Sequence, residues 1–328
     1  MRSGRHGKSG YDVLVPWWCR NPHLQTLWGP LCRPGWTALR RERLDTPDGD
    51  FVDLDWLDGP AGSPVVLVLH GLEGSSSSHY VQGLVRECRA RAWRAVALNF
   101  RSCSGELNRL PRFYHSGETR DLDWVVQQVV AREPRVRLGA VGVSLGGNVL
   151  LKWLGERGEE APTALRGGVG ISVPFDLAAC ARALDQGLRR RVYTANFLWS
   201  MRRKVRAKSR LYPGFVDVDT AWRARTFAEY DRVVTAPLGG FADEADYWRR
   251  ASAGPYLARV RRPLLLISSL DDPIVPATAL PDLPVLGSNW VTAEVTERGG
   301  HAGFLAGPPW RPRFWAELRA IEFLADTL

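Results

Sequence analysis

The feature that most constrains the fold is the stretch of residues 136–155, where an apolar run passes through a serine into a helical pattern. The apolar run VRLGAVGV ends just before Ser144, and Gly142 and Gly146 lie two residues to either side of this serine. After Ser144 the apolar residues recur at three- and four-residue spacing, which predicts a helix. The stretch therefore predicts a strand, a sharp turn and a helix, with Gly-x-Ser-x-Gly at the turn.

Ser144 is a candidate nucleophile because of this turn. A Cβ two residues to either side of the serine would collide across the tight crossing of strand and helix, which explains both glycines. We expect the Ser144 Oγ to stand exposed at the carboxyl edge of a sheet, with the N–H of Leu145 pointing to the place where an oxyanion forms. The alternative is a glycine-rich turn with a chance serine, but the strand–turn–helix context favours the nucleophile.

The acid and the base that such a serine needs follow it in the order serine, acid, histidine. His301 is the only histidine after Ser144, and it follows a predicted strand near residues 290–296 and two glycines. The acid is ambiguous, because an earlier apolar strand runs into both Asp271 and Asp272. We favour Asp272, which directly precedes Pro-Ile-Val-Pro, and keep Asp271 in reserve because the first aspartate more naturally occupies the turn.

A second oxyanion donor is expected in the loop after the early apolar run at residues 64–69. The loop reads His-Gly-Leu-Glu-Gly and lies one strand–helix unit ahead of the serine turn. Folds with this turn take a second backbone N–H from this place, and here the donor would be Leu72. An ordinary glycine turn is the alternative, and we interpret His70 in the same loop as structural.

The length of 328 residues and the hydrophobic content of 45% fit one large domain with an insertion. Residues 11–36 are rich in aromatic residues and proline and should wrap the outside of the core, and we interpret His23 in a His-Leu-Gln-Thr motif there as structural. Short strands are expected at residues 38–44 and 51–57, joined by a turn that contains Asp-Gly. Further strands and helices are expected at residues 79–91, 93–100, 168–173, 243–253 and 311–328, and a helix that ends near residue 132 is expected to start at Ser116 or Thr119.

A helical cap is predicted between the strand at residues 168–173 and the strand that precedes Asp271. About ninety residues in this interval carry helical stretches and no strong strand pattern, which is too long for a plain connection. We therefore expect a helical cap over residues 177–242, inserted in a single domain that spans residues 1–328.

Residues 188–210 of this cap carry nine basic residues interleaved with apolar ones such as Leu188, Val192, Leu198 and Val205. One interpretation is a cap face in peripheral contact with anionic membrane lipids. The other is a solvated helix whose apolar stripe packs on the core, which is the more common arrangement.

Composition and cysteine usage exclude several classes of protein. The net charge is +9, but only four of the 44 basic residues are lysines, which indicates coding composition, and no nucleic-acid-binding motif accompanies the charge. The five cysteines are odd in number and form no Cys-x-x-Cys pair, so we expect no disulfide framework and no zinc site. Catalysis by a serine, a histidine and an aspartate needs no metal and no organic cofactor, so we expect neither. No run approaches the ~18 apolar residues of a transmembrane helix and no signal peptide is evident, so the sequence predicts a cytoplasmic protein.

Seven stretches together resemble the YheT-like family of the α/β-hydrolase superfamily. They are NPHLQTLWGPLCR (21–33), DGDFVDLDW (48–56), HGLEGSSSSHY (70–80), NRLPRFYHSGETRDL (108–122), GVSLGGNVLLKWLGE (142–156), DDPIVP (271–276) and GGHAGF (299–304). The resemblance spans nearly the whole chain and implies the α/β-hydrolase fold, a mostly parallel eight-stranded sheet flanked by helices, with a helical cap. Ser144, Asp272 and His301 fall on the motif positions of the family, whereas Ser102 stands where the family commonly has glycine.

The resemblance implies a serine esterase that cleaves small-molecule carboxylic esters through an acyl-enzyme. His301 would take the proton of Ser144, Asp272 would orient the imidazole, and the N–H groups of Leu72 and Leu145 would stabilise the oxyanion. The abundant tryptophan and the apolar cap favour short- to medium-chain or lipid-like acyl groups. One alternative is an alcohol O-acyltransferase that uses the same acyl-enzyme, and another is a non-catalytic lipid-binding protein, against which the intact triad argues. The sequence leaves the oligomeric state open.

Overall fold

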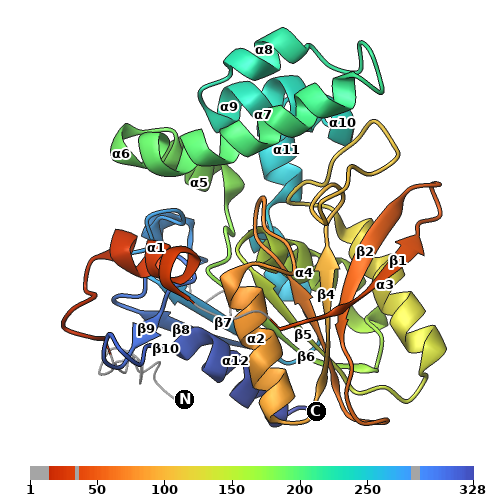
Figure 1. Ribbon diagram of the computed structural model, residues 1–328, viewed down its shortest axis with the longest axis vertical. Coiled ribbons are helices and arrows are strands. Elements are labelled where there is room, and N and C mark those ends of the chain that lie inside the picture. The colour runs from red at the N-terminus through yellow and green to blue at the C-terminus, as the bar shows by residue number, and fades with distance from the viewer. Residues whose placement is uncertain (1–14, 34–36, 282–288) are drawn as a thin grey trace.

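An eight-stranded sheet forms the centre of the protein, whose computed structural model describes residues 15–33, 37–281 and 289–328 (Figure 1). The strand order is β1-β2-β4-β3-β5-β6-β7-β8. β2 pairs antiparallel with β1 and β4, and the other neighbouring strands are parallel, which confirms the predicted mostly parallel sheet. The strands are β1 Arg40–Asp45, β2 Phe51–Leu57, β3 Val65–Leu69, β4 Arg94–Asn99, β5 Leu138–Val143, β6 Leu165–Ile171, β7 Leu264–Ser269 and β8 Val291–Thr296.

The first two strands form the predicted hairpin. Its turn is closed by the N–H of Thr46, which donates to the carbonyl of Asp50 at 3.0 Å. Gly49 takes a φ of 82°, in the left-handed region that glycine adopts without steric cost. The hairpin adds an antiparallel edge to a sheet that is otherwise parallel.

Helices cover both faces of the sheet because the central strands are apolar on both sides. In β3, for example, Val65 and Leu67 pack on one face of the sheet, whereas Val66 and Val68 pack on the other. The helices are α3 Thr119–Arg132 and α4 Leu145–Arg157 on the first face, and α2 His79–Ala90 and α12 Trp315–Ala325 on the second.

Two elements begin three or more residues from their predicted starts, and the other boundaries shift by less at the start. β6 begins at Leu165, earlier than the strand expected at residues 168–173, because Leu165 continues the pairing with β5 opposite Leu138. The last helix begins at Trp315 instead of residue 311. The preceding residues form β10 Arg313–Phe314, which pairs antiparallel with β9 Leu305–Ala306 and so keeps this segment extended.

Helices between β6 and β7 form a layer over the carboxyl ends of the parallel strands (Figure 1). We call residues 177–242 the cap. It contains α5 Leu177–Leu184, α6 Gly187–Arg189, the π-helical turn η2 Arg190–Thr194, α7 Ala195–Ser209, α8 Val218–Arg223, α9 Phe227–Tyr230, the π-helical turn η3 Asp231–Thr235 and α10 Ala236–Gly239. The other helical elements are α11 Glu244–Ala251 and the 3₁₀ turns η1 Gly158–Glu160, η4 Gly254–Arg259 and η5 Ala277–Ala279. The described interval is therefore helical, as the sequence predicts.

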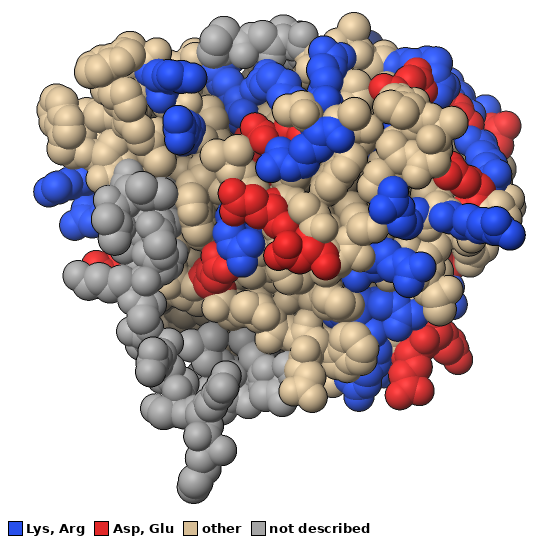
Figure 2. Space-filling model, turned by 90° about the horizontal axis from the view of Figure 1, so that it is seen from below, with Lys and Arg blue, Asp and Glu red and all other residues tan. Residues whose placement is uncertain are grey.

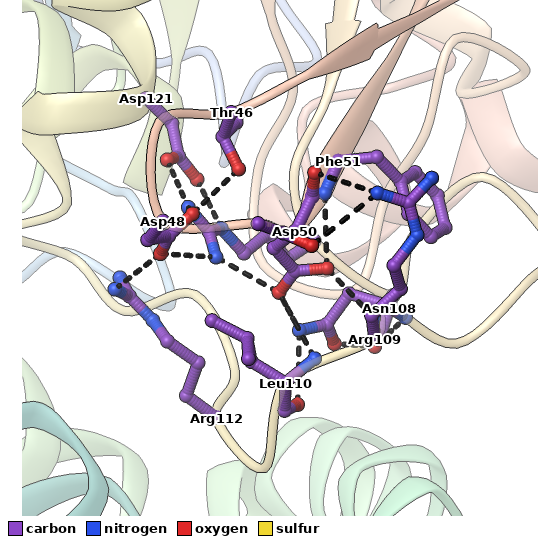
Figure 3. A network of polar contacts seen from close by, with 12 residues as sticks. Thr46, Asp48, Asp50, Phe51, Asn108, Arg109, Leu110, Arg112 and Asp121 are labelled. Atoms are coloured by element: carbon purple, nitrogen blue, oxygen red, sulfur yellow. Dashed lines mark hydrogen bonds and ion pairs between the residues drawn. The ribbon is translucent and has the colours of Figure 1, made fainter.

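A buried polar network joins the β1–β2 turn to the loop after β4 (Figure 3), and Lys208 extends it to the cap. The Arg101 guanidinium contacts Asp50 at 2.8 Å and Asp121 at 2.6 Å. Asn108 Nδ2 donates to Asp50 at 2.5 Å, and Asn108 Oδ1 accepts a hydrogen bond from Lys208 on α7 at 2.5 Å. Because an unpaired buried charge costs several kcal/mol, these partners must stay together, and they fix α7 to the body of the protein.

Ser102 keeps a glycine-like backbone in the loop after β4. Its φ of 64° lies in the left-handed region, which disfavours residues with a side chain. The Ser102 Oγ donates to Asn108 Oδ1 at 2.5 Å and accepts the N–H of Asn108 at 3.2 Å. These two hydrogen bonds hold the loop shape although the residue is not glycine.

The N-terminal segment contributes one helix, which lies against the C-terminal part of the chain. This helix, α1 Pro22–Cys32, begins after Asn21, whose side chain accepts two N–H groups of the first turn. Gln25 on α1 accepts the N–H of Leu305 at 2.8 Å, which ties the two ends of the chain together.

Residues 11–14 and 34–36 of the predicted wrapping segment lie outside the described residues. Across residues 15–33, 37–281 and 289–328, no helix is long and apolar enough to cross a membrane.

Candidate active site

Ser144 stands on a strained turn between β5 and α4. Its φ of 54° and ψ of −122° are rare for a residue with a side chain. A Cβ on Gly142 would lie 2.5 Å from the Gly146 carbonyl oxygen, and a Cβ on Gly146 would lie 2.5 Å from the His70 carbonyl oxygen. Both glycines are therefore required by close backbone contacts, which is the geometry that the sequence predicts for this turn.

The structure brings Asp272 and His301 together. Asp272 Oδ2 lies 2.8 Å from His301 Nδ1, and the aspartate side chain is only 2% exposed. Asp272 Oδ1 accepts the N–H groups of Ile274 and Val275 at 2.7 and 2.9 Å. The two backbone donors fix the carboxylate, so that its second oxygen faces the imidazole.

Asp271, the reserve candidate for the acid, has a different environment. Its Oδ1 accepts the N–H of Gly300 at 2.9 Å, next to His301, and its buried Oδ2 has no hydrogen-bond partner among the described residues. Burial raises the pKa of Asp271, and the neighbouring Asp272 adds to this effect. Asp271 thus braces the backbone of the histidine loop, and the contact with the ring belongs to Asp272.

Ser144 and His301 line the same cavity, which has a volume of about 530 Å³. Its walls come from α1, from the loop after β3 and from the cap, where Tyr193 and Phe197 face it. Ser144 also lines a second cavity of about 100 Å³ beneath the cap. Apolar side chains dominate that second cavity, among them Leu177, Cys180, Leu184, Phe197, Met201 and Trp248.

Both predicted oxyanion donors lie beside Ser144. Leu145 is the first residue of α4, where a backbone N–H has no acceptor within the helix. Leu72 shares both cavities with Ser144, and a Cβ on the preceding Gly71 would lie 3.2 Å from the Ser144 Cβ. Within the described part of the chain, no residue accepts a hydrogen bond from the N–H of Leu72 or Leu145.

Thr26 on α1 is a site residue that the sequence reasoning missed. Its Oγ accepts the N–H of His301 at 2.9 Å and donates to the Pro22 carbonyl at 2.7 Å. A Cβ on Gly300 would lie 2.8 Å from this oxygen, so the helix and the histidine loop are in close contact. The His-Leu-Gln-Thr motif was the available signal, but its threonine carries the contact and His23 instead binds Tyr193 of the cap at 2.7 Å.

No set of three or more His, Cys, Asp and Glu side chains is gathered to hold a metal ion in the described ranges. The groups at Ser144 are a hydroxyl, an imidazole paired with a carboxylate, and two backbone N–H groups. Such an arrangement provides a nucleophile, a proton acceptor and donors for a developing oxyanion.

Known proteins resemble this chain in sequence and in fold. A family model described as alpha/beta hydrolase fold matches residues 64–308. YheT of Escherichia coli (strain K12), which is named as an esterase, is 39% identical over 94% of this chain and 91% of its own length. The phospholipase ABHD3 of Homo sapiens is 30% identical over 88% of this chain and 73% of its own length.

Solved structures agree on the fold. The esterase Pf2001 of Pyrococcus furiosus superposes with a TM-score of 0.57 at 16% identity, covering 90% of this chain and 97% of that one. An identity of 16% supports a shared fold only. The family assignment is based on the family model and on the sequence relatives. The chain belongs to the α/β-hydrolase fold family, in the YheT-like branch of esterase- and lipase-type enzymes.

Proposed function

We propose that this protein hydrolyses carboxylic esters by acyl transfer to Ser144, with His301 as the base and Asp272 as the acid that orients it. The observation that carries the proposal is the Asp272–His301 pair, 2.8 Å apart, whose histidine lines the cavity of a serine held on a strand–helix elbow. The esterase and lipase names of the sequence relatives support the same reaction class.

The reaction proceeds in two acyl-transfer steps. His301 takes the proton from Ser144 as the Oγ attacks the ester carbonyl, and the N–H groups of Leu72 and Leu145 stabilise the oxyanion. The alcohol leaves with the proton that His301 returns, and the acyl group stays on Ser144. Water then attacks the acyl-enzyme with His301 as base, and the released acid restores the serine.

The two cavities at Ser144 would hold different parts of the ester substrate. We assign the acyl chain to the apolar cavity of about 100 Å³ beneath the cap, because its walls are largely aliphatic and aromatic. The small volume favours short- to medium-chain acyl groups. The larger cavity of about 530 Å³, with more polar walls, takes the alcohol part. A lipid-like ester fits this division, in keeping with relatives named phospholipase and monoacylglycerol lipase.

The test is hydrolysis of p-nitrophenyl esters from acetyl to palmitoyl by the wild type and by Ser144→Ala. We expect the variant to lose at least about 10³-fold in kcat, and the chain-length optimum to fall at short to medium acyl groups. Ser77→Ala is the control, because Ser77 is an exposed serine in the wall of the same cavity. Equal rates for the wild type and Ser144→Ala would remove Ser144 as the nucleophile.

Added ethanol separates hydrolysis from acyl transfer in the same assay. Free acid as the main product supports the esterase, whereas an ethyl ester as the main product indicates an O-acyltransferase. Failure of a serine-directed phosphonate to label a folded wild type would favour the non-catalytic lipid-binding alternative.

We further propose that the outer face of the cap contacts anionic lipid surfaces. Leu188, Val192 and Trp199 are 61%, 37% and 55% exposed on this face, although the sequence had grouped the first two with a core-facing stripe. Arg203 stacks over the Trp199 ring at 4.5 Å. Residues 188–210 contain no acidic side chain, and five of their nine basic side chains are exposed, which gives a surface that complements anionic lipid. The five are Arg190, Arg191, Arg203, Arg206 and Arg210.

A further inference from the structure

Glu73, the residue after the proposed oxyanion donor Leu72, has an unusual backbone. Its φ of 56° lies in the left-handed region, where a residue with a side chain is strained. Such a conformation persists only when neighbouring groups hold it. The N–H of Glu73 donates to the hydroxyl of the buried Tyr114 at 2.7 Å, and this hydroxyl donates back to Glu73 Oε1 at 3.1 Å.

The other partners of the Glu73 carboxylate come from the cap. Lys204 Nζ donates to Glu73 Oε1 at 2.8 Å, and Ser200 Oγ donates to Oε2 at 2.5 Å. Both residues lie on α7, and the Glu73 side chain is 8% exposed. Burial acts to lower the pKa of Lys204, but Cys103 and Glu73 outweigh it and raise this pKa above its ordinary value, so the ammonium stays charged. A charged pair shielded from water is a strong constraint on both partners.

We infer that Glu73 is a positioning residue of the oxyanion hole and that α7 completes it through Lys204 and Ser200. The inference rests on the function proposed for Ser144 and Leu72. The carboxylate is held between Tyr114 of the body and α7 of the cap, and it fixes the strained backbone next to the Leu72 N–H.

Cap docking and oxyanion binding are therefore coupled. When α7 moves away, Glu73 loses two of its partners and the backbone at Leu72 is free to turn out of position. A donor displaced by about 1 Å costs on the order of 10²-fold in rate, so the enzyme is competent only with the cap closed.

Lys208 provides a matched control on the same helix. It lies one turn after Lys204, is fully buried, and donates to Asn108 Oδ1 at 2.5 Å and to the Leu110 carbonyl at 2.6 Å. Its hydrogen bonds anchor α7 to the loop after β4 and do not involve the loop of Leu72. Because Lys204 and Ser200 still hold α7 against Glu73, loss of Lys208 lowers the stability of the fold and leaves the contacts of Glu73 in place.

The experiment compares Glu73→Gln, Lys204→Met and Lys208→Met. Glutamine keeps the size of Glu73 but lacks the charge that pairs with Lys204, and its amide nitrogen cannot accept the second of the two hydrogen bonds from the cap. For Glu73→Gln and Lys204→Met we expect kcat to fall by about 10- to 100-fold with KM within about threefold. The double variant should be no slower than the slower single one, because both break one interaction. Lys208→Met should lower Tm and leave kcat within about threefold of the wild type.

Hydrogen exchange of residues 70–75 is the second measurement, and it does not depend on activity. We expect faster exchange in Glu73→Gln and Lys204→Met than in Lys208→Met and the wild type. Equal kcat losses in Lys204→Met and Lys208→Met, or unchanged exchange in the Glu73 variant, would overturn the inference. A wild type without Ser144-dependent hydrolysis would overturn the proposed function instead, and the exchange data would still report on the contacts between Glu73 and α7.

Discussion

The two neighbouring aspartates after β7 hold different parts of the same loop, and substitution separates their roles. Asp272→Asn replaces the oxygen that faces His301 Nδ1, so we expect kcat/KM to fall by about 10³- to 10⁴-fold. Asp271→Asn keeps an oxygen for the Gly300 N–H, so we expect a loss below about tenfold. Ester hydrolysis by both purified variants gives the comparison. Equal losses, or the larger loss in Asp271→Asn, would reverse the assignment.

Thr26 offers a second test on a single residue, because one hydroxyl supports the backbone of His301. Thr26→Val keeps the shape of the side chain but leaves the His301 N–H without its acceptor, which should cost about 1–3 kcal/mol of unfolding free energy. We expect kcat to fall as well, since the histidine loop loses its contact with α1. Urea unfolding and ester hydrolysis measure the two effects. Thr26→Ser retains the hydroxyl and should restore both, and a serine variant as impaired as valine would argue against the hydrogen bond.

Candidate residues of the site can be chosen from the sequence where only one residue carries the local pattern. Ser144 has the only strand–turn–helix pattern with flanking glycines, and His301 is the only histidine that follows it. The choice between Asp271 and Asp272 depends on which carboxylate oxygen faces the ring, and two backbone N–H groups of a non-repetitive turn decide this. Thr26 escaped although it belongs to the His-Leu-Gln-Thr motif, because its contact with His301 spans most of the chain and the motif does not say which of its residues makes it.

At the scale of elements, the contact between η3 and α11 buries the carboxylate of Asp231, which makes the stability of the fold depend on pH. Asp231 accepts hydrogen bonds from Thr235 at 2.6 Å and from Trp248 at 2.9 Å, and burial raises its pKa to about 7. The folded state therefore binds the proton more tightly than the unfolded state. This contribution to stability is fully present below the unfolded pKa of about 4 and is lost as pH rises through about 7.

We expect the unfolding free energy of the wild type to fall by up to about 1.4 kcal/mol for each pH unit between about pH 4 and 7 through this group. Asp231→Asn should show a flatter profile, because asparagine does not titrate. Urea unfolding at several pH values gives the slopes. Glu322→Gln, which changes an exposed glutamate on α12, should keep the slope of the wild type. A variant slope equal to the wild type would mean that Asp231 titrates normally.

For the helix α7, the spacing of apolar residues predicts the helix but not which of its faces is buried. The sequence predicts a helix here, but it treats all the apolar residues of the stretch as one stripe. Leu198 and Val205 are seven residues apart and face the interior, where both are buried. Trp199 on the same helix is exposed, because it follows Leu198 by one residue and so points about 100° away from it. Leu188 is also exposed, but it lies before α7, on α6. Two faces were therefore present in the pattern, and packing decides which one is buried.

At the scale of the whole molecule, charge is distributed unevenly. On the side away from the cap, basic and acidic side chains are interspersed (Figure 2). On the outer face of the cap the exposed charges of residues 188–210 are all basic and lie among exposed apolar side chains, whereas Lys204 and Lys208 contact Glu73 and Asn108 on the inner side. We propose residues 1–328 as one domain with the cap of residues 177–242 inserted over its site, so that a lipid surface on the cap would lie next to the cavity lined by Tyr193 and Asn196.

Vesicle binding tests this arrangement. We expect the wild type to bind vesicles that contain anionic lipid, to bind neutral vesicles much more weakly, and to dissociate as salt rises from about 0.05 M to about 0.5 M. Replacing Arg190, Arg203 and Arg206 together by glutamine should weaken binding about 10²-fold, at about 1 kcal/mol for each charge near the surface. Trp199→Ala should weaken it further, because an exposed apolar anchor is lost.

The matched control removes the same charge from the opposite side of the molecule. Arg89, Arg135 and Arg259 are exposed and precede the amino ends of β4, β5 and β7. Their replacement by glutamine lowers the net charge equally and leaves the cap intact.

If net charge alone drives binding, both triple variants lose the same affinity. If the cap face is the contact, only the cap variant detaches from the vesicles, and hydrolysis of vesicle-borne esters falls with it while that of soluble esters does not. Equal loss of affinity in both variants would mean that the cap does not contact the lipid surface. Its helix would then be a solvated helix whose apolar stripe packs on the core.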